Sequence, residues 1–137
     1  HPRRRVHPLR APPIMNRIRF SALLGLLAII LGALGAHGRL HDLLVAAGEL
    51  DHWETAGRYH LPHAIFATVL AIWGAHGGKR AAWAWGFLIA GMLLFSGSLY
   101  VLAITQIKWL GAVTPFGGLS LMLGWLLVGF ANWRAKE

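Results

Sequence analysis

The sequence predicts an all-α integral membrane protein, a four-helix bundle with a short outer amphipathic helix between the first two spans. Hydrophobic residues make up 56% of the 137-residue chain, and charged residues make up only 13%, against about 25% in an ordinary soluble domain. The apolar residues gather in long runs, with arginine and lysine concentrated between them. The chain has no cysteine, which excludes a disulfide scaffold, a thiolate metal site and a cysteine nucleophile.

Four apolar runs have about the length of a spanning helix, which takes about 20 residues. The predicted spans cover about residues 20–37, 59–76, 81–104 and 109–132. We expect helices because an open strand would leave backbone groups without partners in lipid. In the second span, Pro62 falls in what would be the first turn, where proline is tolerated. The predicted organisation is a single membrane domain over residues 15–137.

Residues 1–14 precede this domain and are basic and rich in proline and arginine, without a helical period. We expect a disordered extension, with Met15 as the natural start. An arm that binds anionic lipids is the alternative, because arginines beside a membrane attract such lipids. The run after Met15 also resembles a secretory signal peptide. Its length and its face of small residues favour a retained span.

Between the first two spans, apolar residues recur with a helical period while acidic residues occupy other faces. The apolar positions are Leu40, Leu43, Leu44, Ala47 and Leu50. This pattern predicts a short amphipathic helix on the outer membrane surface.

Small residues recur at helical spacing within the spans, and close helix packing in lipid depends on such residues. The first span shows them at alternating intervals of four and three from Ser21 onward. The glycines expected to pack against neighbouring helices are Gly25, Gly32, Gly35, Gly97, Gly117 and Gly124. We assign them no chemistry.

The basic residues are distributed unevenly about the predicted spans. Ten arginines and lysines fall on the side that holds both termini and three on the other, whereas four of the five acidic residues fall on that other side. Because the positive side of a membrane protein faces the cytoplasm, both termini are predicted to be cytoplasmic. Six of the seven tryptophans lie near predicted span ends, which agrees with this arrangement. The net charge of +8 therefore indicates orientation in a lipid bilayer, and we expect no nucleic-acid partner.

Several polar side chains are predicted to lie toward the outer side. His60 and His63 are three residues apart, so a helix places them on one face. Ionisable groups in membrane segments are functional candidates by default. The candidate polar pocket comprises His37, Tyr59, His60, His63, Ser96, Ser98, Tyr100 and Thr114. Hydrogen bonding is the favoured role of the histidine pair. Binding of zinc, copper or haem iron and proton transfer are the alternatives, and no cofactor is expected.

No nucleophile–base pair identifies a catalytic residue, and no span contains the buried carboxylate that a proton-coupled exporter would need. The sequence therefore favours a non-enzymatic accessory or structural membrane bundle, alone, as a homo-oligomer or within a larger membrane complex. The alternative is an outer-leaflet site for a metal, haem or a small ligand that uses His60 and His63. A small transporter ranks third.

Five motifs occur in order along the chain. They are GALGAHG (32–38), WETA (53–56), YHLPHA (59–64), FSGSLY (95–100) and WLGAVTPFGG (109–118). The set resembles the domain-of-unknown-function four-two-three (YgdD-like) family of small bacterial inner-membrane proteins, over about residues 15–133. The resemblance implies a four-helix protein of the bacterial plasma membrane and implies no activity.

Overall fold

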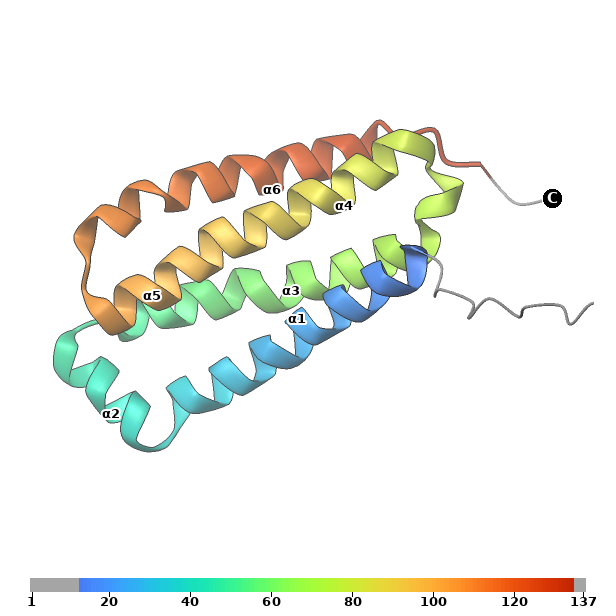
Figure 1. Ribbon diagram of the computed structural model, residues 1–137. Coiled ribbons are helices and arrows are strands. Elements are labelled where there is room, and N and C mark those ends of the chain that lie inside the picture. Colours follow the sequence, from blue (N-terminus) through green and yellow to red (C-terminus); the bar gives the residue numbers. More distant parts are fainter. Residues whose placement is uncertain (1–12, 135–137) are drawn as a thin grey trace, which may run out of the picture.

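The computed structural model describes residues 13–134, and all their regular structure is helical. The α-helices are α1 (Pro13–Ala36), α2 (Gly38–Ala47), α3 (Leu50–Trp73), α4 (Gly78–Met92), α5 (Ser98–Thr105) and α6 (Thr114–Gly129). Two 3₁₀ helices, η1 (Gly74–His76) and η3 (Lys108–Ala112), precede α4 and α6, and the π-helix η2 (Leu93–Gly97) joins α4 to α5. Four long rods result, namely α1, α3, the continuous α4–η2–α5 and α6 (Figure 1).

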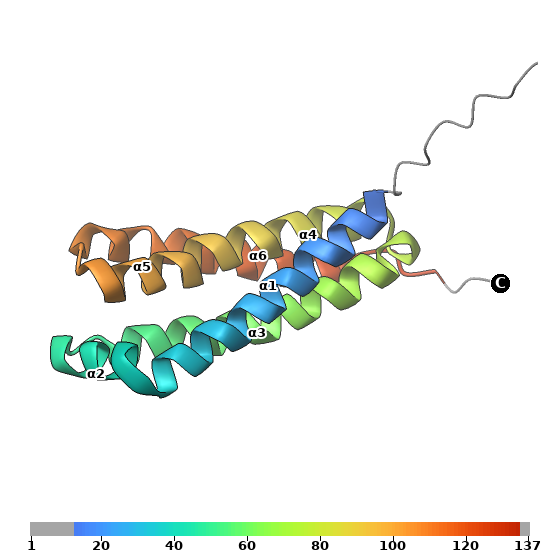
Figure 2. The same cartoon turned by 60° about the horizontal axis from the view of Figure 1, so that its bottom comes forward.

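The long rods run alongside one another, and α2 turns the chain from α1 to α3 at one end (Figure 2). α1 packs along α3, α4 packs along α6, and α3 also contacts α4 and α5. The extension predicted for residues 1–14 falls outside the described residues up to position 12, and α1 begins at Pro13.

Among the described residues, three helical stretches are long and apolar enough to cross a membrane. They are Pro13–Ala36, Gly78–Thr105 and Lys108–Gly129, which contain most of the predicted first, third and fourth spans. Helix α3, which holds most of the predicted second span, is not among them because its first half carries charged residues and histidines. The structure therefore supports the all-α class and three candidate spans directly.

Helix α3 begins well before the apolar run from which its span was predicted. Its N-terminal part is helical from Leu50, and the buried Trp53 and Ala56 extend its packing face into the polar segment. Pro62 consequently lies in the interior of α3, so its predicted place in the first turn is wrong. Because proline has no backbone N–H, the Arg58 carbonyl lacks its usual partner within the helix.

A helix does follow α1 where the sequence predicts an amphipathic one. α2 ends at Ala47 and is capped by Gly48, whose φ of 71° lets its N–H reach the Leu44 and Val45 carbonyls. Leu44 is buried in the bundle, whereas Leu43 and Val45 are exposed. One side of α2 is thus packed against the other helices.

Buried side chains form three clusters along the length of the bundle. Beside α2 the cluster consists of Leu44, Trp53, Ala56, Leu99, Tyr100 and Ala103. The middle cluster consists of Leu24, Ala64, Ala67, Ile89 and Met92. At the far end it consists of Leu70, Ala81, Ala84, Leu88 and Leu121. Alanine recurs in all three clusters, and small side chains of this kind let helices approach closely in lipid.

The six glycines expected to pack between helices have different surroundings. A Cβ on Gly35 would overlap the Trp53 indole, and one on Gly117 would overlap the backbone of Phe95. On Gly124 it would lie 2.8 Å from Leu88 Cδ2, and on Gly25 at an ordinary 3.8 Å from Ala64 Cβ. Nothing lies within 4 Å of a Cβ on Gly32 or Gly97. Backbone contact is therefore closest between α6 and η2.

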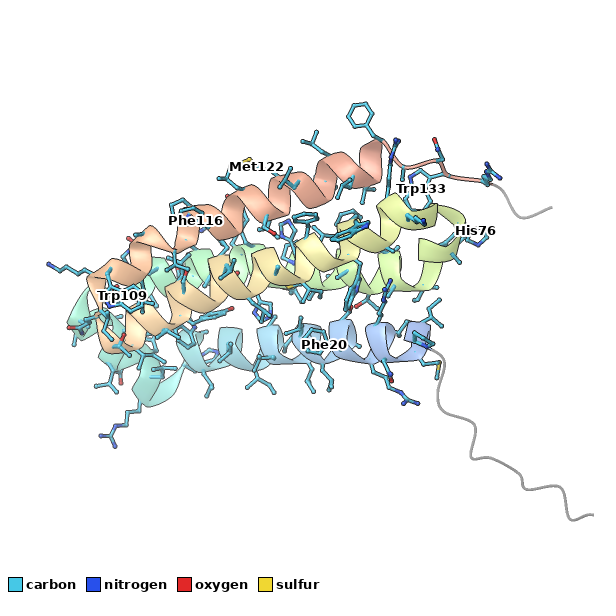
Figure 3. All side chains as sticks on the ribbon, turned by 45° about the horizontal axis from the view of Figure 1, so that its top comes forward. Phe20, His76, Trp109, Phe116, Met122 and Trp133 are labelled. Atoms are coloured by element: carbon cyan, nitrogen blue, oxygen red, sulfur yellow. The ribbon has the colours of Figure 1, made fainter. Side chains whose placement is uncertain are left out.

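Large apolar side chains cover the outside of the bundle. Figure 3 shows Phe116 and Met122 on the outer side of α6, and they are 68% and 63% exposed. Such continuous apolar exposure is expected where lipid replaces water as the solvent.

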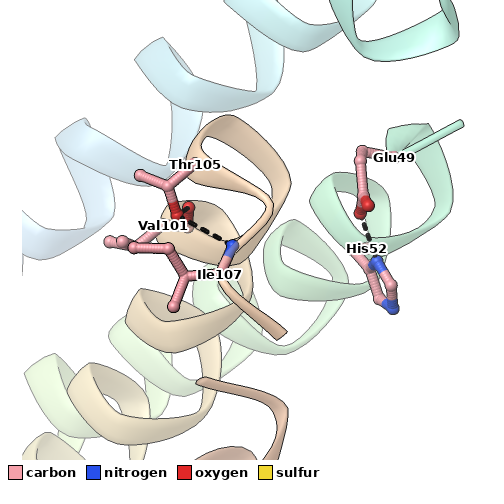
Figure 4. Close-up of polar contacts among 5 residues, drawn as sticks. All are labelled: Glu49, His52, Val101, Thr105 and Ile107. Carbon is pink, nitrogen blue, oxygen red and sulfur yellow. Dashed lines mark hydrogen bonds and ion pairs between the residues drawn. The ribbon is translucent and has the colours of Figure 1, made fainter. Parts of the chain in front are cut away.

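Local hydrogen bonds shape the chain at the α2 end of the bundle (Figure 4). The Thr105 hydroxyl donates to the Val101 carbonyl at 2.6 Å and accepts the Ile107 N–H at 3.4 Å, which closes the end of α5. The Glu49 carboxylate lies 2.6 Å from His52 Nδ1. Among the side chains of residues 13–134, this is the one contact between a basic and an acidic group at ion-pair distance.

Replacing Gly117 by alanine should destabilise the protein, because the new Cβ would overlap the Phe95 backbone. Overpacking of this kind costs about 1–3 kcal/mol. Gly32→Ala is the matched control, since its Cβ meets nothing. Denaturation of both variants in detergent micelles measures the difference. Equal unfolding midpoints for the two variants would contradict the close approach of α6 to η2.

Candidate functional site

His60, Ser96 and Tyr100 meet where α3 faces η2 and α5. His60 Nδ1 lies 3.0 Å from the Tyr100 hydroxyl, and the Ser96 hydroxyl donates to the Ala56 carbonyl at 2.8 Å. All three side chains are buried, and His60 is only 5% exposed. They line a cavity of about 70 Å³, to which α1 contributes leucines such as Leu24 and Leu31.

The π-helix η2 positions this group. Ser96 lies in the wider turn of η2, on the side that faces α3. On the α6 side, Gly117 allows the backbone of α6 to lie directly against the backbone of Phe95. Single π-turns inside α-helices occur frequently at functional sites.

Trp53 packs against the group of His60, Ser96 and Tyr100 and connects it to α1. Its ring packs edge-on against Tyr100 with the centroids 4.8 Å apart. Its indole N–H donates to the Leu31 carbonyl of α1 at 2.9 Å. Trp53 can pack this closely because Gly35 of α1 has no side chain.

His63 faces a different neighbour from His60. Its Nδ1 lies 2.7 Å from the Tyr59 carbonyl, and the Trp125 indole N–H donates to its Nε2 at 3.1 Å. Because an indole nitrogen can only donate, Nε2 must accept and Nδ1 carries the proton. His63 is therefore a neutral imidazole with both nitrogens hydrogen-bonded.

These contacts separate the two histidines. His60 points to α5 and His63 to α6, so the pair does not converge on one point. Within the described residues, no three histidine, aspartate or glutamate side chains are grouped so that they could hold a metal ion.

The other predicted pocket residues lie around this group. Ser98 and Thr114 join α5 to α6 through hydroxyls 2.6 Å apart. Tyr59 is 42% exposed and packs between His63 and Phe95. His37 is exposed at the corner between α1 and α2, away from the rest.

Several side chains that join the helices were not among the predicted site residues. The Trp85 indole donates to the Ser21 hydroxyl at 2.9 Å, and the Ser120 hydroxyl donates to the Phe87 carbonyl at 2.8 Å. From the sequence alone, tryptophans were used only to locate the membrane–water interfaces at the ends of the predicted spans. The rule that a buried indole N–H finds a partner could have identified them.

The site thus consists of hydrogen bonds between helices. In the part of the chain that the structure describes, no buried side-chain nitrogen or oxygen lacks a partner. The Ser96 hydroxyl is bonded to a backbone carbonyl, and the Tyr100 hydroxyl is paired with the His60 imidazole. Chemically, the arrangement can hold helices together and bind a molecule no larger than its small cavity.

Comparison with known proteins identifies the family. The family model described as a protein of unknown function (DUF423) matches residues 31–118. The chain belongs to the DUF423 family. No solved structure matches it.

DUF423 relatives resemble the chain over nearly their whole length. The UPF0382 membrane protein YwdK of Bacillus subtilis is 39% identical over 81% of this chain and 90% of its own. The UPF0382 membrane protein SAB0533 of Staphylococcus aureus is 34% identical over 85% and 94%. One from Haemophilus influenzae is 32% identical over 85% and 92%. The resemblance in the motifs is confirmed, and the chain is a membrane protein of a family whose description names no activity.

Tyr100→Phe should destabilise this DUF423 protein by about 1–3 kcal/mol, because it leaves His60 Nδ1 buried without its partner. Tyr59→Phe is the control. Among the described residues the Tyr59 hydroxyl makes no hydrogen bond, so this variant should stay within about 0.5 kcal/mol of the parent. Denaturation in mixed micelles compares the two. A Tyr100→Phe variant as stable as Tyr59→Phe would show that the His60–Tyr100 bond contributes nothing.

Proposed function

We propose that this DUF423 protein is a non-enzymatic, four-span bundle of the bacterial plasma membrane with both termini in the cytoplasm. Its role would be that of a structural or accessory subunit, as a homo-oligomer or within a larger membrane complex. The observation that carries the proposal is the pairing of every described buried polar side chain within the bundle. Such pairing is what a structural role for these side chains requires.

Helix α3 is the fourth span in this proposal, although its composition alone does not require it. Gly35 of α1 lies at Trp53, and Gly25 lies at Ala64, so α1 and α3 run antiparallel along their length. If α1 crosses the bilayer, α3 crosses beside it. The polarity of α3 is then acceptable, because His60 and His63 are hydrogen-bonded to α5 and α6.

The charges of the described residues support the orientation. The end that holds the start of α1 and the turn before α4 carries Arg17, Arg19, Lys79, Arg80 and Arg134, and no described acidic residue. The end that holds α2 carries three basic residues and all four described acidic residues. By the positive-inside rule the first end is cytoplasmic, which places α2 at the outer surface.

Single cysteines test the topology, since the chain has none of its own. We expect Arg39→Cys and Lys108→Cys to react with a membrane-impermeant maleimide in intact cells. Lys79→Cys should react only after the membrane is opened. The physical reason is that α3 and α4 each place a bilayer between these positions.

The same three variants distinguish the four-span arrangement from one in which α3 does not cross the membrane. If α3 does not cross, positions 39 and 79 lie on one side and must label alike, while position 108 must label oppositely. That pattern would contradict the proposed bundle. If only position 79 reacts in intact cells, the protein has four spans but the opposite orientation, with both termini outside the cytoplasm.

Metal analysis and a visible absorption spectrum of the purified protein test its structural role. We expect no stoichiometric metal and no haem band. His63→Ala should lower stability by about 1–3 kcal/mol, because Trp125 loses its acceptor. A metal or haem lost in His60→Ala and His63→Ala variants of unchanged stability would establish a ligand site in place of this role.

A further inference from the structure

We propose that the cytoplasmic end of the bundle binds the phosphate of an anionic phospholipid between η1, the start of α4 and the segment after α6. The proposal rests on the cytoplasmic placement of this end, where such headgroups lie against the protein. Binding of such a lipid would come in addition to the structural role proposed above.

A pocket of about 550 Å³ opens at this end. Its lining includes His76, Lys79, Arg80, Asn132 and Arg134. This is ample room for a phosphate with its glycerol, whereas the His60 cavity at about 70 Å³ is not.

The chain after α6 folds back to form one wall of the pocket. The Arg134 N–H donates to the His76 carbonyl at 2.9 Å, and His76 Nδ1 lies 3.3 Å from the Arg134 carbonyl. Trp133 packs over Gly77, where a Cβ would lie 2.8 Å from its ring, and donates its indole N–H to the Val128 carbonyl at 2.9 Å. Figure 3 shows Trp133 and His76 at this end of the bundle. These contacts hold the backbone of Trp133 and Arg134 against η1 and Gly77.

The charge of the pocket is not neutralised within the described residues. No described carboxylate lies within ion-pair distance of Lys79, Arg80 or Arg134. The Arg80 guanidinium donates once, to the Phe130 carbonyl at 2.7 Å, which leaves most of its five N–H groups for another acceptor. Three cations around one cavity would attract a phosphate. Basic pockets between spanning helices on the cytoplasmic side are typical sites for acidic headgroups.

An apolar groove continues from the pocket and favours a lipid over free phosphate. The groove has about 350 Å³, is lined by side chains such as Leu70, Ala82 and Trp85, and shares Ala75 and Gly78 with the pocket.

Arg17 lies at the edge of this groove, with its guanidinium 5.2 Å from the centre of the Trp85 ring. A charged pocket that opens into an apolar groove matches a phosphate attached to an acyl chain. A free anion would leave the groove without a function.

The test uses the purified full chain in a neutral detergent, with dioctanoyl phosphatidylglycerol as the probe. Dioctanoyl phosphatidylcholine and inorganic phosphate at the same concentrations serve as the other arms. Thermal unfolding as a function of probe concentration gives the apparent affinity. We expect phosphatidylglycerol to raise the unfolding midpoint and the other two to leave it nearly unchanged.

The variant Lys79→Gln/Arg134→Gln removes two of the three cations. Neither side chain makes a hydrogen bond within the described residues, so the variant should unfold at the parental midpoint without lipid. We expect its affinity for phosphatidylglycerol to fall about 30-fold, given the usual attraction of each basic residue for an anionic headgroup. Arg39→Gln/Lys108→Gln removes the same charge at the opposite end and should bind as the parent does. Lys79→Gln alone, an exposed position, should bind about fivefold more weakly.

Three outcomes would overturn the proposal. Equal stabilisation by phosphatidylcholine would remove the role of the charge, and equal stabilisation by inorganic phosphate would remove the role of the groove. If the Arg39→Gln/Lys108→Gln variant lost as much affinity, the net charge of the protein would explain the binding and no specific pocket would be needed. Binding in detergent is independent of orientation, so a failed binding test leaves the cysteine-labelling result intact, and a failed labelling test leaves the binding result intact.

Discussion

The bundle depends on the hydrogen bonds that helix α3 makes with the helices around it. Lipid offers no partner to a polar side chain, so each such group within the membrane must be satisfied by the protein itself. α3 bonds to α1 through Trp53, to α5 through His60 and to α6 through His63. These bonds allow a helix with this many polar residues to occupy the interior of an otherwise apolar protein.

The hydrogen bonds in turn depend on small residues. Trp53 reaches the Leu31 carbonyl only because Gly35 leaves room for its ring. η2 can face α3 through Ser96 and α6 through the Phe95 backbone because Gly117 has no side chain. Since apolar side chains gain nothing by leaving lipid for a neighbouring helix, close packing and hydrogen bonds together must supply the specificity of assembly.

The sequence predicts the helical class and four spans, and three of these lie in helical stretches that are long and apolar enough to cross a membrane. It misplaces the start of α3, because Trp53 and Ala56 are buried by neighbouring helices rather than by lipid and lie outside the apolar run. Hydropathy alone does not distinguish a residue that is buried against other helices from one that is buried in lipid.

The candidate site could be predicted in part, for a related reason. His60, Ser96 and Tyr100, which belong to the predicted pocket, lie together. His63 does not join them. Three residues correspond to about 60° of rotation on a helix, and in a bundle that is enough to face a different neighbour. The number and position of the neighbouring helices decide this, and those depend on the whole chain.

The two ends of the molecule use their polar residues in opposite ways. Around η2, each buried side-chain donor and acceptor of the described residues is paired inside the protein, so His60 and His63 contribute to assembly. Around η1, backbone bonds between His76 and Arg134 hold the chain after α6 against η1, and no described carboxylate neutralises the cations there. Several like charges that are gathered at one place and not compensated attract a ligand of opposite charge. Recognition of another molecule by this DUF423 protein is therefore to be sought at the basic end.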